Sequence, residues 1–179
     1  MAKEIYEAVR RTWLCRGCVS PKPGTPEVDA TIQELEPDNT PINIVNGCGL
    51  GIARKEFLFA LGEDVIRRYL FLGRVFRQDG AELENWVTFH GKHEIIVRGS
   101  KHVSFRKCPE CGKRLYFAMG KRYLYPEPPK GIEMFDSGCG GLVVTERLVV
   151  RITLNKWRKL ACIKLPVFSA PKDGLAELT

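Results

Sequence analysis

Two short cysteine motifs, far apart along the chain, constrain its fold more than any other feature. Cys15 and Cys18 are separated by two residues, and so are Cys108 and Cys111. This spacing lets both sulfurs of one motif reach the same ion, while backbone N–H groups of the turn face the thiolates. Together the motifs supply the four ligands of a closed tetrahedral site. The sequence therefore predicts a structural zinc ion that ties the N-terminal part of the chain to its middle.

The residues around these cysteines favour metal binding. Gly17 lies inside the first motif and Pro109 inside the second, and Gly112 follows the second motif, where a left-handed backbone is often required. The alternatives are two redox pairs or pairs of buried thiols. The charged N-terminus lacks the apolar segment of a signal peptide, so we expect a cytoplasmic protein in which disulfides are not maintained.

The other cysteines and the histidines give little indication of catalysis. Cys48 and Cys139 lie in glycine-rich segments and Cys162 alternates with apolar residues, so we expect all three to be small buried hydrophobic residues. Nothing in the sequence places a histidine near Cys48 or Cys139 as a catalytic base. Metalloprotease, P-loop and nucleophile-elbow motifs are also missing from the sequence. We therefore expect a protein that is not an enzyme.

Hydrophobic patterning predicts one α+β domain over residues 1–179, with a mostly antiparallel sheet and two or three short helices. One helix is expected from Arg54 to Gly62, a second from Glu63, and a third after Thr145 with Leu148, Val149 and Ile152 on its apolar face. Turns are expected at 79–80, 90–91 and 99–100, and a hairpin around Gly120. Strands are predicted over 5–14, 28–35, 42–45, 71–77, 86–90, 93–98, 103–107, 114–118, 122–125, 132–135, 142–144 and 159–168.

The positive charge is concentrated around the second cysteine motif. The formal net charge is +7, and between residues 98 and 130 nine lysines and arginines face only Glu110 and Glu127, a surplus of seven. Aromatic residues alternate with these cations, which is typical of nucleic-acid binding by stacking and phosphate contacts. Alternatively, the aromatic rings point into the core and the cations form a solvated face or contact an acidic protein. The aromatic residues are Phe105, Tyr116, Phe117, Tyr123 and Tyr125.

Three segments resemble the double-CxxCG-motif family of bacterial proteins. They are the two cysteine motifs, the stretch Arg98-Gly-Ser-Lys101 that leads to the second motif, and the later stretch from Phe135-Asp-Ser to Gly141-Leu-Val-Val-Thr-Glu-Arg147. The resemblance covers most of the chain and is firmest from Ile42 onward. Val19 stands where the family has a glycine, but zinc binding depends on the sulfurs. Several members look like immunity partners encoded beside polymorphic or contact-delivered toxins.

The resemblance implies an inhibitor that binds a cognate toxin through a protein–protein interface. Immunity proteins against nucleases often carry acidic surfaces, so the basic segment here fits a toxin with an acidic rim around its active site. The alternative is a zinc-ribbon-type protein that binds nucleic acid through residues 98–130. Large aromatic residues and arginine are the usual interface anchors. The candidate contact residues are Trp13, Trp86, Trp157, Tyr123, Tyr125, Arg114 and Arg122.

Overall fold

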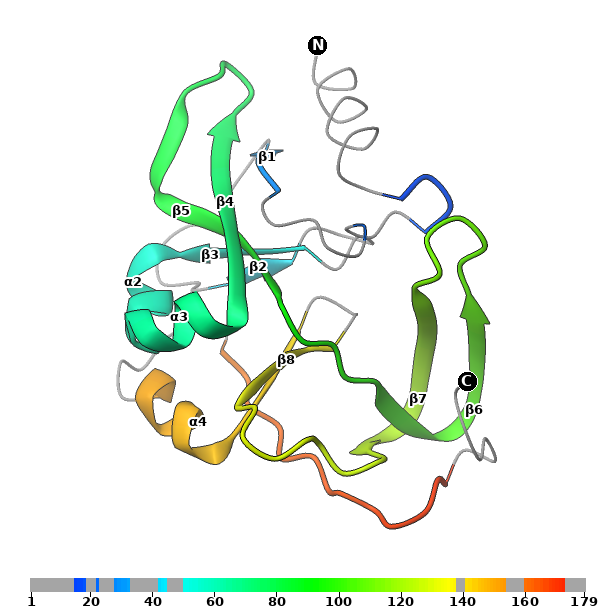
Figure 1. Cartoon of the computed structure of the whole chain (residues 1–179). Helices are drawn as coiled ribbons and strands as arrows, with labels where there is room; N and C mark the ends of the chain where they lie inside the picture. Colours follow the sequence, from blue (N-terminus) through cyan, green and yellow to red (C-terminus); the bar gives the residue numbers. More distant parts are fainter. Residues whose placement is uncertain are drawn as a thin grey trace.

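A five-stranded sheet forms the larger part of the structure (Figure 1). The computed structural model describes residues 15–18, 22, 28–32, 42–44, 50–137, 141–153 and 160–172. β1 runs parallel to β4 and every other neighbouring pair in this sheet is antiparallel, which confirms the predicted α+β fold with a mainly antiparallel sheet. In spatial order, the strands are β1 (Ala30–Ile32), β4 (Leu70–Arg77), β5 (Glu82–Gly91), β3 (Gly51–Arg54) and β2 (Ile42–Ile44).

Three short helices, all expected from the sequence, contribute buried residues to one core cluster. They are α2 (Lys55–Phe59), α3 (Glu63–Tyr69) and α4 (Glu146–Thr153). Gly62 joins α2 to α3 with a φ of 99°, a conformation that favours glycine. Arg151 of α4 donates a hydrogen bond from Nη1 to the carbonyl oxygen of Leu61 at 2.6 Å, so α4 is attached to the end of the α2 segment.

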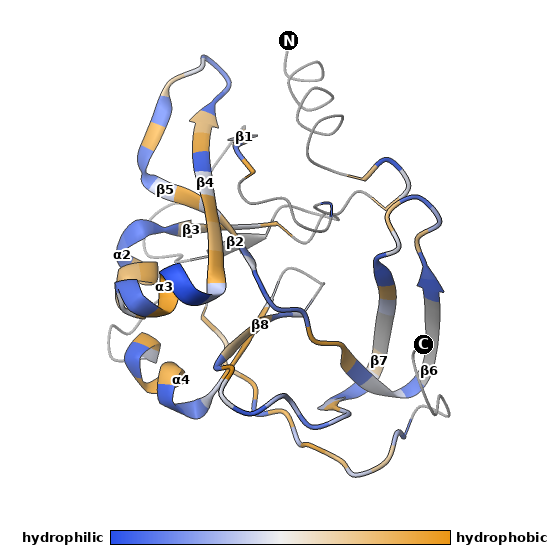
Figure 2. Cartoon of the chain, in the orientation of Figure 1, coloured by the Kyte–Doolittle hydropathy of each residue, from blue (hydrophilic) through white to orange (hydrophobic). Residues whose placement is uncertain are grey.

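Residues on opposite faces of the sheet form two apolar clusters, as strand alternation requires. Ile52 and Trp86 belong to the smaller cluster, whereas their neighbours Ala53 and Val87 belong to the larger one. The helices contribute apolar residues to the larger cluster, and in Figure 2 apolar and polar residues alternate along α2, α4 and β4. The smaller cluster consists of Val28, Ala30, Leu50, Ile52, Val75 and Trp86.

A separate two-stranded ribbon extends from the main sheet. It consists of β6 (Val97–Lys107) and β7 (Arg114–Leu124), which pair antiparallel. A third, small sheet of β8 (Met134–Asp136) and β9 (Leu142–Val144) lies where β5 leads toward the ribbon. There, Asp136 donates its backbone N–H to the carbonyl of His93 at 2.7 Å, and Ile95 donates to the carbonyl of Asp136 at 2.9 Å.

The predicted turn at Gly99-Ser100 and the predicted hairpin around Gly120 are wrong. Both glycines lie inside the long ribbon strands, at irregularities of the β6–β7 register. A Cβ on Gly99 would stand 2.1 Å from the carbonyl oxygen of Met119, and Gly120 has a φ of 78°. Glycines in strands mark bulges and close backbone contacts as well as turns.

Three further predictions fail and one lies outside the described residues. The predicted strand at 93–98 is wrong over most of its length, because an isolated bridge at Glu94 precedes β6, which begins at Val97. The predicted closing strand at 159–168 is wrong, because the described residues 160–168 have only an isolated bridge between Val167 and Leu124. The turn at 90–91 is also displaced, because β5 continues to Gly91. The predicted strand at 5–14 lies outside the described part. By contrast, the turn at Asp79-Gly80 is confirmed, with Gly80 at a φ of 87° and its N–H bonded to Arg77.

Helix α4 offers a direct test of how much the larger cluster stabilises the fold. Leu148 is completely buried in that cluster, whereas Val150 on the same helix is 56 % exposed. Leu148→Ala leaves a cavity and should lower the free energy of unfolding by about 2 to 5 kcal/mol. Val150→Ala should change it by less than about 0.5 kcal/mol. Chemical denaturation of both variants checks this, and equal effects would contradict the assigned packing.

Candidate metal centre

The second cysteine motif forms the turn of the ribbon. β6 ends at Lys107 and β7 begins at Arg114, so residues 108–113 connect the two strands. The N–H of Cys108 donates to the carbonyl of Lys113 at 2.8 Å, and the N–H of Gly112 donates to the carbonyl of Cys108 at 2.9 Å. Gly112 has a φ of 72°, as its position after the motif predicted. The backbone of the turn therefore places Cys108 and Cys111 on one side of the loop.

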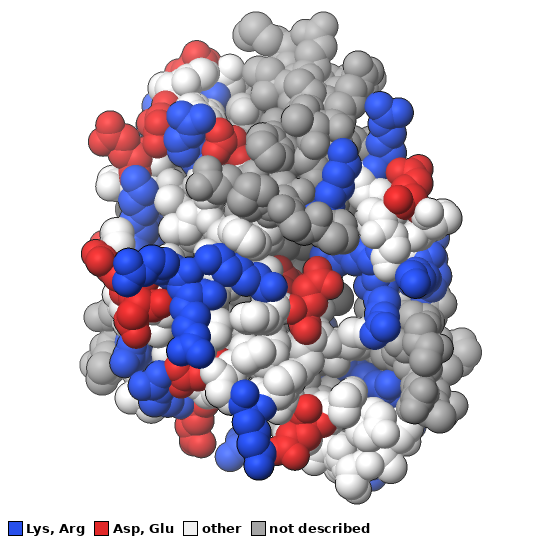
Figure 3. Space-filling view, in the orientation of Figure 1, with Lys and Arg blue, Asp and Glu red and all other residues white. Residues whose placement is uncertain are grey.

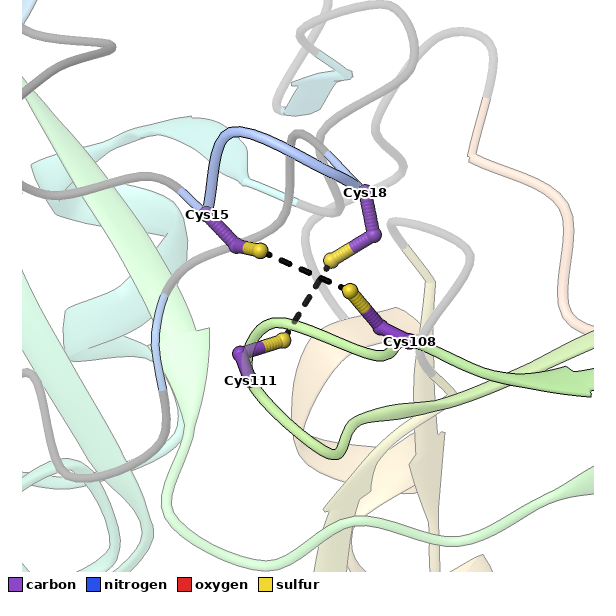
Figure 4. A group of neighbouring side chains, drawn as sticks. All are labelled: Cys15, Cys18, Cys108 and Cys111. Carbon is purple, nitrogen blue, oxygen red and sulfur yellow. Dashed lines mark hydrogen bonds between the residues drawn. The ribbon is translucent and has the colours of Figure 1, made fainter.

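Four sulfur atoms from the two motifs converge on one point (Figure 4). The Sγ atoms of Cys15, Cys18, Cys108 and Cys111 all lie within 4.8 Å of one another. The Cys15–Cys108 and Cys18–Cys111 distances are both 3.6 Å, too long for disulfides, whose sulfurs lie about 2.05 Å apart. A tetrahedral metal with sulfur ligands at about 2.3 Å has ligand–ligand edges of about 3.8 Å. The cluster predicted from the spacing is therefore formed, with a geometry that could hold a metal ion.

The pKa values of the cysteine thiols are shifted in opposite directions by their surroundings. A hydrogen bond from the backbone N–H of Cys111 lowers the pKa of Cys108 to about 7, and one from the N–H of Glu110 acts in the same direction. Burial raises the pKa of Cys111 to about 12, and burial also raises the pKa of Cys15. Collecting several negative charges in this buried place is costly unless a cation balances them. A bound metal cation would supply that balance.

Glu110 connects the two motifs in a way that sequence reasoning missed. Its Oε2 accepts a hydrogen bond from the N–H of Gly17 at 2.8 Å and lies 3.5 Å from the Sγ of Cys15. A Cβ on Gly17 would stand 3.2 Å from the Sγ of Cys108, so the first motif approaches the second closely at this glycine. The only sequence signal was an acidic residue inside the second motif. A cavity of about 260 Å³ beside the cluster is lined by Cys15, Arg16, Lys22, Glu110 and Cys111.

The predicted contact residues fall into three groups. Arg114 and Arg122 are exposed on β7, and Tyr125 is half-buried with the guanidinium of Arg98 5.0 Å from its ring centre. Tyr123 and Trp86 were also predicted to contact a partner, but they are only 1 % and 7 % exposed and offer almost no area for such a contact.

The hydroxyl of Tyr123 accepts a hydrogen bond from the backbone N–H of Lys172 at 2.7 Å. The guanidinium carbon of Arg54 lies 4.9 Å from the ring centre of Trp86. These two aromatic residues therefore stabilise the fold. Trp13 and Trp157 lie outside the described residues.

Of the other three cysteines, Cys162 is the one that the structure describes, and it is not part of the cluster. Cys162 is exposed, so its predicted burial is wrong. The segment around Cys162 has no regular secondary structure, so its alternating apolar residues do not line up on one buried face as they would in a strand. Cys48 and Cys139 lie outside the described residues.

Fold and site together define an α+β protein with a four-cysteine cluster that could hold a metal ion. No family model, curated protein or solved structure matches the chain. Within the described residues, no helix has the length and apolar character needed to cross a membrane.

The position of the cluster at the ribbon turn predicts what loss of one ligand does. Cys108→Ser should reduce bound metal several-fold and should speed amide hydrogen exchange in β6 and β7 more than in β4 and β5, because the turn loses its attachment. Elemental analysis and hydrogen-exchange mass spectrometry measure the two effects. Cys162→Ser is the matched control and should change neither, since Cys162 is exposed. Full metal content and unchanged ribbon exchange in Cys108→Ser would contradict the assignment.

Proposed function

We propose that the chain is a zinc-stabilised immunity protein that binds and neutralises a cognate bacterial toxin inside the producing cell and catalyses no reaction. The observation that carries the proposal is the cationic surface of the β6–β7 ribbon, whose turn contains the metal centre. The resemblance of the cysteine motifs and flanking segments to the double-CxxCG-motif family supports the same class of function.

Zinc is the metal that the ligand set favours. Four thiolates in a tetrahedral arrangement suit zinc or iron, and soft sulfur ligands disfavour magnesium and calcium. Four protein ligands fill the coordination shell, so the ion has no open position for water or substrate. A metal held in this way stabilises the ribbon turn and takes no part in chemistry.

The ribbon carries a surplus of exposed cations (Figure 3). Lys107 and Arg114 are direct cross-strand neighbours, and like charges in such positions destabilise a strand pair. Lys113 differs, since it is buried and paired with Glu94 at 2.9 Å. An arrangement of cations that costs folding energy fits a surface whose charge is used for binding an acidic partner. The exposed cations are Lys101, Arg106, Lys107, Arg114, Lys121 and Arg122.

The two tyrosines that the structure describes within the ribbon strands favour a protein partner over nucleic acid. Tyr116 and Tyr123 are buried, and the hydroxyl of Tyr116 accepts a hydrogen bond from the N–H of Gly99 at 3.1 Å. Rings used in this way are not offered to bases for stacking. Met119 is 59 % exposed among the cations and adds an apolar contact. A protein surface with carboxylates around an apolar patch complements this side of the ribbon.

The metal assignment predicts one zinc ion per chain in protein purified without added metal. Replacement by Co²⁺ should give the visible absorption of a tetrahedral thiolate site, because the four ligands are sulfurs. Mass spectrometry under native conditions and elemental analysis measure the stoichiometry. Iron in place of zinc, or a chain with four free thiols and no metal, would refute the assignment.

The toxin proposal predicts rescue and charge-dependent binding. Co-expression of the chain with the toxin domain encoded beside it should restore growth, and the two proteins should co-purify. The double variant Lys121→Glu, Arg122→Glu should weaken binding about tenfold or more, mainly through slower association, because both cations are exposed on β7. Arg77→Glu, an exposed charge reversal at the end of β4, is the matched control. Calorimetry and association kinetics give the two constants.

Nucleic-acid binding makes a different prediction for the same variants. A chain that binds arbitrary single-stranded DNA at low salt, with an affinity that falls steeply as salt rises and is lost in the Lys121→Glu, Arg122→Glu variant, would favour the nucleic-acid alternative. Failure to co-purify with the toxin domain, together with failure to rescue growth, would overturn the immunity proposal.

A further inference from the structure

A groove on the main sheet, remote from the ribbon, combines an apolar floor with a cationic rim. It lies along α2, α3 and β4, which Figure 1 places on the other side of the structure from β6 and β7. Its volume is about 400 Å³, within the range of ligand-binding pockets. The lining residues that carry the argument are Leu58, Phe59, Ile66, Arg67, Phe71 and Lys92.

The floor is made of side chains that the fold already holds in place. Leu58 and Ile66 belong to the larger core cluster and are 1 % and 8 % exposed, so they present a fixed apolar surface. Phe59, at the end of α2, is 57 % exposed, although neighbouring Leu58 is buried. Because Phe59 also lines the groove, it extends the apolar lining to the surface, where a bound side chain can pack against it.

The rim is positively charged. Lys55, Arg67 and Lys92 line the groove against the single acidic residue Glu63. Glu56 and Asp64 belong to the same two helices but do not line the groove. The cations are therefore not balanced at the groove itself.

One of these cations has a fixed position. The ammonium of Lys92 donates to the carbonyl oxygen of Arg67 at 2.6 Å and lies 5.0 Å from the ring centre of Phe71. Lys92 therefore joins the end of α3 to β4 and fixes one edge of the groove. An edge of this kind is arranged before any ligand arrives, which lowers the cost of binding.

We infer that this groove binds a short peptide segment of a partner protein in which a large apolar side chain is flanked by carboxylates. The apolar side chain fills the space over Leu58 and Ile66, and Phe59 covers it. The carboxylates reach Arg67 and Lys92 on the rim. A concave groove accepts a side chain that projects into it, whereas a membrane surface is contacted by protruding faces. This inference is independent of the toxin proposal, because the groove and the ribbon share no residue.

The test maps the binding of a defined probe onto the full-length chain. The probe is the acetylated and amidated hexapeptide Asp-Glu-Leu-Phe-Glu-Asp, titrated into isotope-labelled protein and followed through the amide resonances. The expected result is saturable shifts in residues 55–72 and at Val87 and Lys92. Phe59→Ser and Arg67→Glu should each weaken binding at least about fivefold. Both residues are exposed, so neither change removes a buried side chain. The matched controls Val150→Ser and Arg77→Glu, exposed and outside the groove, should leave the affinity unchanged.

Several results would overturn the inference. One is equal affinity of the wild type, Phe59→Ser and Arg67→Glu. A second is the same groove shifts from a peptide with Ser-Ser in place of Leu-Phe, or from one with lysines in place of the acidic residues. Shifts confined to the ribbon would show attraction to its cations alone. Groove shifts caused by phosphatidylglycerol vesicles, or by self-association without any peptide, would assign the groove to a membrane or to a second copy of the chain.

Discussion

The meeting of four sulfurs at the turn of the ribbon is the contact on which the arrangement of the rest depends. An isolated two-stranded ribbon is at best marginally stable in water. This one is supported at its turn, where Cys108 and Cys111 meet Cys15 and Cys18. At its other end, Leu124 exchanges backbone hydrogen bonds with Pro166 and Phe168 at 2.9 and 3.1 Å. The cluster joins a segment early in the sequence to the middle of the chain, so a cation bound there would stabilise a long-range contact.

The two halves of the structure are stabilised in different ways. The main sheet has apolar clusters on both faces, and helices contribute to the larger one, so burial of side chains such as Leu148 and Val75 is enough to explain its order. Among the ribbon side chains that the structure describes, few are buried and apolar, and the ribbon carries most of the surplus charge. Its structure depends on hydrogen bonds, on the cysteine cluster and on buried Tyr116 and Tyr123. The ribbon can therefore present many cations without disturbing the apolar clusters of the main sheet.

Local patterns predicted the elements that local forces decide. The three helices begin close to the predicted residues, because acidic first turns and apolar spacing act within one or two turns. The wrong predictions concern patterns that occur in more than one kind of structure, such as a glycine, which is common both in turns and at irregular points within strands. Gly99 and Gly120 each indicate a turn when considered alone, but both lie within strands. At Gly99 the backbone of Met119 leaves no room for a side chain, and Gly120 has a positive φ. The alternation around Cys162 is typical of a strand, yet among the described residues 160–168 only Val167 forms a bridge, with Leu124.

The sequence by itself determined the composition of the candidate metal site, because sulfur chemistry and two-residue spacing allow few other uses for two such motifs. It also located the charge surplus around the second motif. Only the tertiary structure brought Cys15 and Cys108 within 3.6 Å, placed Glu110 between the motifs and buried Tyr123 while leaving Arg122 exposed. These outcomes depend on contacts between residues far apart in the chain and on which face of a strand is covered. A pattern of neighbouring residues does not contain that information.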